Sequence, residues 1–270
     1  MIITIKDDFD LKKIEYSGQC FRAKELTDFP GLFRFILDDK ILYIKKIEEN
    51  KYEVDCSEAD WTNIWTPFFD LGTNYSKIRK SIVDDPFMHN ASDFGAGIRL
   101  LAQPHFETLI SFIISQRKNI PAIKSSIEKL SELLGQKYTT EYEEIYSFPT
   151  PEAILSASFD DINGCGLGYR TGYIIDAAQK VADKDIKLNE LEALDDDELI
   201  NQLKTIKGVG DKVANCVALF SYGRKSLAPV DVWIQRLIDN EYNGTNPFVK
   251  YGDIAGVMQQ YAFYYMTHGK

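Results

Sequence analysis

The sequence has few of the residues that build metal centres and disulfide frameworks. Among 270 residues it has three histidines and four cysteines, with no CxxC pair: Cys20, Cys56, Cys165 and Cys216. Zinc and iron–sulfur ligands usually stand close together in sequence, so this scatter gives no candidate ligand set and we expect no catalytic metal. Free thiols are typical of a reducing compartment, so we expect a cytoplasmic protein.

The sequence also lacks a long hydrophobic run. No segment reaches the roughly 18 apolar residues that a membrane span needs, and Met1–Ile5 is followed by acid at Asp7 and Asp8 rather than by a signal peptide. We therefore expect neither a membrane partner nor secretion. With 44% hydrophobic and 27% charged residues, the composition is that of a folded globular protein.

Positive charge is in deficit. There are 31 lysines and arginines against 41 acidic residues, a formal net charge of −10. Such a total argues against a protein that binds DNA by bulk charge. It does not exclude contacts from backbone amides and a few local cations, which act within a Debye length. The acidic runs, such as 195–198, are interpreted as solvated faces.

The pattern of apolar residues predicts an α+β protein. Residues 1–56 favour strands, with β-rich runs at 33–37 and 41–44 around a turn at Asp38–Lys40, and another strand at 51–55. Ser57 begins a helical pattern. We expect a small N-terminal antiparallel β-sheet domain with flanking helices (1–95), then a mainly helical domain (96–270). The clearest helices are predicted at 106–115, 120–134, 169–181, 211–220, 232–240 and 251–267.

Residues 203–216 (LKTIKGVGDKVANC) predict two helices joined by a tight glycine turn. Gly208 and Gly210 flank Val209 and allow a close backbone approach, and amides at the start of the next helix favour an anion. A glycine turn alone is most often only a turn. Apolar residues before it and the small Ala214 after it make the pattern more specific, and favour a helix-hairpin-helix, at about 196–220, that contacts DNA phosphates.

Lys212 lies in the first turn after this hairpin, and Asp231 follows in a Pro-Val-Asp segment. Lys212 could simply neutralise phosphate, and Asp231 could simply cap the next helix. Together with the hairpin, however, the two residues resemble the helix-hairpin-helix DNA glycosylase superfamily, and within it the 8-oxoguanine DNA glycosylase/AP lyases. The resemblance implies that Lys212 attacks the sugar C1′ and that Asp231 assists. The amine must then be neutral, which requires a lowered pKa.

The resemblance extends to segments that would recognise the damaged base. Ser17–Arg22 (SGQCFR) is similar to a family segment whose glycine carbonyl, here that of Gly18, accepts a hydrogen bond from N7–H of 8-oxoguanine. Gln259 stands where a glutamine reads the base edge. Phe263 and Cys216 stand where side chains stack on the two faces of the flipped base. Taken alone, Phe263 and Cys216 would be interpreted as core residues.

Two loops are implied to contact DNA. Arg117, Lys118 and Asn119 lie in the 115–120 loop, which falls where the family fills the gap left by the flipped base. Tyr169 falls where a tyrosine wedges the duplex, and Arg170 where an arginine contacts the orphaned base. The family's asparagine pair is replaced by Arg117–Lys118. At Ala122 many members carry an arginine that reads the opposing cytosine, so we expect a weak preference for the opposing base.

Two alternatives remain open at this point. The chain could be a glycosylase for another damaged base, although the four-cysteine cluster of one such branch is missing, or a non-catalytic DNA-binding module. The favoured hypothesis is a monomeric glycosylase/AP lyase that acts on double-stranded DNA containing oxidised guanine. It would be nucleoid-associated in a prokaryote and nuclear in a eukaryote. No cofactor is expected, apart from a structural cation that hairpin carbonyls hold in related proteins.

Overall fold

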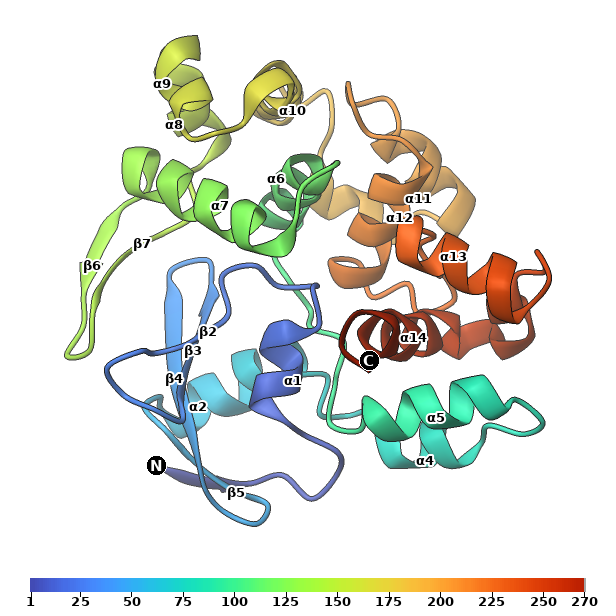
Figure 1. Cartoon of the computed structure of the whole chain (residues 1–270). Helices are drawn as coiled ribbons and strands as arrows, with labels where there is room; N and C mark the ends of the chain where they lie inside the picture. The colour runs from blue at the N-terminus through green and yellow to red at the C-terminus, as the bar shows by residue number, and fades with distance from the viewer. Residues whose placement is uncertain (270) are drawn as a thin grey trace. The chain divides into compact units, whose positions relative to one another are not determined.

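The computed structural model describes residues 1–269 and contains a five-stranded sheet in the order β1-β5-β4-β3-β2 (Figure 1). Its β1–β5, β4–β5 and β2–β3 pairs are antiparallel, with Ile3 opposite Tyr52 and Ile44 opposite Val54. The predicted sheet is thus confirmed. The strands are β1 (Ile2–Thr4), β2 (Lys24–Glu25), β3 (Leu32–Leu37), β4 (Lys40–Glu48) and β5 (Lys51–Val54).

The prediction of strands throughout residues 1–56 was wrong for one segment, because Leu11–Tyr16 forms helix α1. The Asp10 side chain accepts a hydrogen bond from the Lys13 amide, which caps the helix, and Leu11 and Ile14 are both buried. Two apolar residues at a spacing of three are too short a pattern to distinguish a single helical turn from a strand.

Two compact units make up the chain. Unit 1 contains residues 1–35, 41–103 and 219–270, and unit 2 contains residues 36–40 and 104–218. The predicted boundary between residues 95 and 96 divides the chain differently and stays a prediction. No helix within residues 1–269 is long and apolar enough to cross a membrane.

Unit 1 buries an aromatic cluster under its sheet. The rings of Phe35, Phe68 and Phe69 meet edge to face, with centroids 4.9 to 6.0 Å apart, a geometry that aromatic pairs prefer. Ser57 caps the first of the helices that carry this cluster, as predicted. The later helices of unit 1 are α2 (Glu58–Asp60), η1 (Trp61–Trp65), α3 (Thr66–Phe68), α4 (Tyr75–Lys80), α5 (Pro86–Phe94), α13 (Val232–Glu241), η4 (Pro247–Ile254) and α14 (Ala255–His268).

Unit 2 is mainly helical, which confirms the predicted α+β class (Figure 1). Helix α6 lies in the core of the unit, since residues 108–114 are buried on every side of the helix. The unit also contains a two-stranded β-hairpin, β6–β7, that was not predicted. Its elements are α6 (His105–Ser115), α7 (Ile120–Leu134), β6 (Lys137–Thr139), β7 (Glu144–Tyr146), α8 (Pro151–Ser156), α9 (Phe159–Gly164), η2 (Gly168–Arg170), α10 (Thr171–Ala182), η3 (Leu188–Ala193), α11 (Asp196–Leu203) and α12 (Asp211–Phe220).

Candidate functional site

The glycine turn between α11 and α12 forms as predicted, and α11 ends at Leu203 with its cap at Lys204. Gly208 has a φ of +83°, and a Cβ there would overlap the ring of Tyr173. Gly210 has no such contact: a Cβ would meet no atom within 4 Å. The first glycine is therefore required by the fold, whereas the second leaves space next to the start of α12.

Side chains from outside the hairpin hold the turn in place. The Gln116 amide donates to the Gly208 carbonyl at 3.1 Å, and the carbonyl of Gln116 accepts from the Arg170 guanidinium. Across the turn, the Lys204 ammonium pairs with Asp211. Gln116 and Arg170 thus connect the hairpin to the two loops that were predicted to contact DNA.

Lys212 lies on the first turn of α12, and its side chain is half-buried. Its Nζ donates to Ser115 Oγ at 3.3 Å and lies 5.1 Å from the centroid of the Phe112 ring. The Ser115 hydroxyl in turn donates to the Phe112 carbonyl at 2.8 Å. Cys216, one turn further along the same helix face, is buried. The amine is therefore held by the end of α6 inside unit 2.

The predicted contact loop at 117–119 is partly committed to the protein itself. Lys118 Nζ donates to Ser126 Oγ and to the Gly166 carbonyl. Burial, followed by the nearby charge of Arg170, lowers the pKa of Lys118. The Asn119 side chain caps α7. Arg117 is exposed and has a φ of +52°, a conformation that asparagine tolerates better than arginine does. Of the two cations, Arg117 is thus the more accessible to a phosphate.

Tyr169 and Arg170 differ in exposure. Tyr169 is 55% exposed, whereas Arg170 is 7% exposed and stacks beneath the Tyr169 ring at 4.4 Å from its centroid. The Tyr169 ring is therefore accessible from solvent, whereas the Arg170 guanidinium donates to the Gln116 carbonyl and so holds that loop. A direct base contact by Arg170 stays a prediction.

Asp231 belongs to unit 1, where it precedes α13. Its carboxylate accepts a hydrogen bond from the Ile234 amide at 2.9 Å, which confirms the predicted helix cap. The side chain is half-buried. The Ile234 amide bonds to Oδ1, and within residues 1–269 Oδ2 has no hydrogen bond, so this second oxygen is available for another partner.

The predicted base-recognition residues Gly18, Gln259 and Phe263 also belong to unit 1. Gly18 has a φ of +77° at the turn that follows α1. Gln259 is 5% exposed, and within residues 1–269 its Oε1 has no hydrogen-bond partner. A buried amide oxygen without a partner is costly, so this atom is suited to a ligand.

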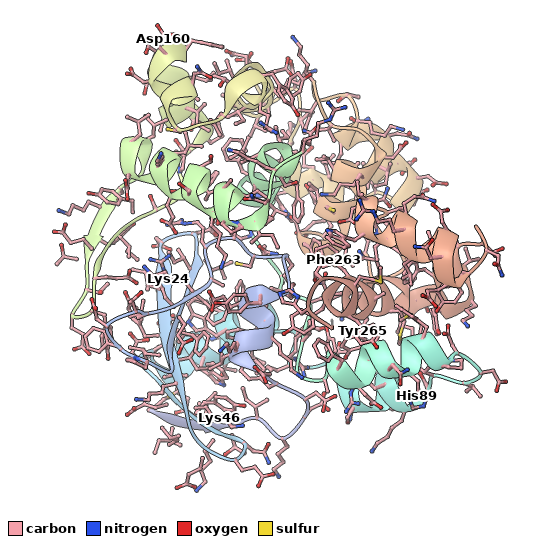
Figure 2. All side chains as sticks on the ribbon, viewed as in Figure 1. Lys24, Lys46, His89, Asp160, Phe263 and Tyr265 are labelled. Atoms are coloured by element: carbon pink, nitrogen blue, oxygen red, sulfur yellow. The ribbon has the colours of Figure 1, made fainter. Side chains whose placement is uncertain are left out.

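The direction of the Phe263 side chain follows from the contacts of Tyr265, two residues further along α14. Tyr265 packs against Phe87 and Phe94 of α5, with ring centroids 5.5 Å apart in both pairs. Residues two apart on a helix point in nearly opposite directions, so Phe263 points away from α5 (Figure 2). Phe263 is partly exposed, as a stacking platform requires.

In the part of the chain that the structure describes, no group of three or more His, Cys, Asp or Glu side chains could hold a metal ion. Two hairpin carbonyls, those of Ile206 and Gly208, accept bonds from Val209 and Gln116. Each carbonyl keeps a second lone pair, and the structural cation stays a prediction.

Sequence reasoning missed Phe112 and Tyr173, and it placed Ser115 and Gln116 in a DNA-contacting loop without predicting their contacts to Lys212 and Gly208. These four residues orient Lys212 or support the hairpin, and none belongs to the hairpin itself. The signal available was the position of Ser115 and Gln116 immediately before the 117–119 loop. It could not show that their side chains turn toward residues 208 and 212.

Comparisons with known proteins agree with this arrangement. Residues 1–109 match the N-terminal domain of 8-oxoguanine DNA glycosylases, and residues 110–247 match the HhH-GPD superfamily of base excision DNA repair proteins. The N-glycosylase/DNA lyase of Saccharomyces cerevisiae is 35% identical, over 88% of this chain and 69% of its own length.

Solved structures give the same result. MBOgg1 in complex with a low-affinity DNA ligand is 38% identical with a TM-score of 0.94, covering 100% of this chain and 96% of that one. The Clostridium acetobutylicum 8-oxoguanine glycosylase/lyase, bound to DNA with cytosine opposite 8-oxoguanine, is 33% identical with a TM-score of 0.90, covering 100% and 98%. The chain therefore belongs to the 8-oxoguanine DNA glycosylase/lyase family of the HhH-GPD superfamily.

Proposed function

We propose that this chain removes 8-oxoguanine from duplex DNA and then cleaves the strand at the abasic site. The observation that carries the proposal is the position of the Lys212 amine, which is held by Ser115 and Phe112 next to the hairpin. A lysine that only neutralised phosphate would keep its ammonium in solvent. The partial burial of Lys212 therefore supports a chemical role.

In the proposed reaction the deprotonated Lys212 Nζ attacks C1′ of the flipped nucleotide. The new N–C1′ bond replaces the bond from C1′ to the base, which leaves with that electron pair and takes up a proton. The nitrogen lone pair then forms the C=N bond of a Schiff base as the C1′–O4′ bond breaks, and the ring oxygen takes up the proton that the amine loses. Removal of a proton from C2′ breaks the C3′–O bond and releases the phosphate, which nicks the strand on the 3′ side.

Asp231 would stabilise the positive charge that develops at the sugar as the base leaves. Its second carboxylate oxygen supports this role, because the oxygen that accepts from Ile234 already serves the helix. Gly18 and Gln259 would read the base, and Phe263 and Cys216 would stack on it. The partnerless Oε1 of the buried Gln259 supports that assignment.

The nucleophile is tested by trapping. Borohydride should trap a covalent complex between the wild-type chain and duplex DNA that contains 8-oxoguanine. Lys212→Gln should lose trapping and slow base release by at least about a thousandfold, with lesion binding retained. Lys180→Gln, on α10 of the same unit, is the control that changes a lysine without a proposed role. Undiminished excision by Lys212→Gln would refute the assignment, and binding without any trapping would leave a non-catalytic DNA-binding module.

Asp231→Asn separates charge from capping, because asparagine caps helices about as well as aspartate does. The single-turnover rate should fall about a hundredfold, while the melting temperature changes little. An unchanged rate would contradict the electrostatic role. Asp231→Ala is the matched variant, since it removes both the charge and the bond to Ile234 and should also lower stability.

The base opposite the lesion should matter little. Ala122 occupies the third position of α7, and its side chain has no atom that could donate to a cytosine. We propose that excision opposite C and opposite A proceeds at rates within about fivefold, because Ala122 cannot make the base contact that would otherwise supply roughly 1–3 kcal/mol of discrimination. Single-turnover rates on duplexes with each of the four opposing bases measure this. Much slower excision opposite A would contradict it.

We also propose that the chain acts as a monomer on double-stranded DNA, in the cytoplasm or wherever the cell keeps its DNA, without a redox cofactor or catalytic metal. Lysine and carboxylate chemistry needs neither. Excision should therefore persist in excess EDTA, and a rate that returned only on adding a divalent ion would overturn this part.

A further inference from the structure

Gln260 connects the base-reading helix to the loop that carries Gly18. Its side chain is 3% exposed, and its Nε2 donates to the carbonyl of Ser17. We infer that Gln260 is a positioning residue that fixes the Gly18 carbonyl and thereby sets the discrimination between 8-oxoguanine and guanine. The inference rests on the proposed function, because it assigns a role within that same site.

The Ser17–Gly18 peptide is the unit that this bond restrains. A peptide group is planar, so an anchor on the Ser17 carbonyl fixes the plane that leads into Gly18. Gly18, at φ +77°, is the flexible point that follows. Without the Gln260 bond, the plane could rotate and carry the next carbonyl with it.

The other side of the loop is held by Gln19, which is fully buried. Its Nε2 donates to Ser17 Oγ at 2.8 Å and to the Arg99 carbonyl at 2.9 Å, and its Oε1 accepts from the Leu101 amide at 2.8 Å. Gln19 therefore fixes the loop to the protein body. Gln260 is the connection to α14.

One acceptor in the loop is left for a ligand. The carbonyls of Ser17 and Gln19 accept bonds from the side chains of Gln260 and Gln103, whereas within residues 1–269 the carbonyl of Gly18 accepts none. Gln259 and Gln260 are consecutive residues of α14. The bond from Gln260 therefore holds the Gly18 acceptor in register with the amide of Gln259, and both would address the same base.

Binding measurements isolate this role from chemistry. In the Lys212→Gln background, the affinity for a duplex with one 8-oxoguanine is compared with that for the same duplex with guanine. Gln260→Met keeps the size of the side chain but cannot donate, and Gln260→Glu places an oxygen against the Ser17 carbonyl. We expect the preference for 8-oxoguanine to fall about tenfold in Gln260→Met, which corresponds to roughly 1.4 kcal/mol, and further in Gln260→Glu.

Cleavage of a preformed abasic site, measured with Lys212 intact, needs no base recognition and reports on folding. It should stay within about twofold of wild type in at least one Gln260 variant. Gln179→Met is the matched control, since the side chain of this exposed glutamine donates to Asp183, at the end of the same helix. An unchanged preference, or a parallel loss of abasic-site cleavage in both variants, would overturn the role of Gln260. If the Lys212→Gln protein itself showed no preference, the proposed function would fail instead.

Discussion

At the scale of single residues, Asp7 shows how a charge supports the scaffold of unit 1. Its carboxylate accepts hydrogen bonds from the Tyr75 and Ser76 amides at the start of α4, at 2.6 and 3.1 Å, and pairs with Arg99. Burial raises the pKa of Asp7, but the bonds from Ser76 and Tyr75 outweigh it and lower the pKa from 3.8 to about 2. The folded state therefore prefers the ionised form.

This shift predicts a stability that depends on pH. A lowered folded pKa contributes stability above pH 3.8 that is lost as the pH falls toward 2, here about 2 kcal/mol at neutral pH. Asp7→Asn should therefore unfold about 2 kcal/mol more easily at pH 7, and the difference should shrink to about half at pH 3. Urea denaturation at both values measures it, with the exposed Asp28→Asn as the control. A difference that did not change with pH would show that the charge is not responsible.

At the scale of elements, the two hairpin glycines should separate folding from binding. Gly208→Ala places a Cβ on the Tyr173 ring at a positive φ, so the free energy of unfolding should fall by about 2–3 kcal/mol. Gly210→Ala has open space and should change it by less than about 1 kcal/mol.

DNA binding should respond differently, because Gly210→Ala should weaken it without a matching loss of stability. A Cβ at Gly210 would occupy the space where a phosphate approaches the start of α12. Gly210→Ala should therefore weaken duplex binding about tenfold at unchanged stability. Fluorescence anisotropy beside thermal melts measures both quantities. Full affinity in Gly210→Ala would mean that the DNA backbone does not approach this glycine.

Elements with strong local patterns could be predicted from the sequence. The helices at 120–134 and 211–220 begin and end where they were predicted, because an asparagine cap, an early proline or acid, and periodic apolar residues mark them. Helix α1 and the β6–β7 hairpin were missed. Helix α1 has six residues and the two strands have three each. Elements this short are stabilised by tertiary packing, so the local sequence carries little signal for them.

At the scale of the whole molecule, the site combines predicted and unpredicted parts. The motifs predict roles for Lys212, Asp231 and Gln259, since each lies in a segment whose residue types are specific. The partners that orient them could not be predicted: the bond from Lys212 to Ser115 spans 97 residues, and that from Gln260 to Ser17 spans 243. Bonds between distant segments leave no periodic signal in a single sequence.

The charge of the whole molecule poses a final problem, because a chain of net charge −10 must bind a polyanion. In the structure, fewer of the predicted DNA-contacting cations are free to bind phosphate than the sequence implied. Lys118 donates to Ser126 and Gly166, and Arg170 donates to Gln116. Of the cations predicted to contact DNA, Arg117 is the exposed one outside the catalytic position. Binding should therefore depend mainly on backbone amides at the hairpin, with few displaced counterions.

Few displaced counterions mean a weak dependence on salt. Each neutralised phosphate contributes about −0.9 to the slope of log K against log salt, so about three contacts give a slope near −3. Titrations of Lys212→Gln with duplex DNA at salt concentrations between about 50 and 300 mM, over which the Debye length changes by roughly 2.4-fold, measure it. Arg117→Gln should make the slope shallower by about 0.9, whereas Lys118→Gln should leave it unchanged, because that ammonium is engaged with Ser126 and Gly166. If Lys118→Gln reduced the slope as much as Arg117→Gln, Lys118 would have to leave those partners on binding, and the loop at 117–119 would rearrange on DNA.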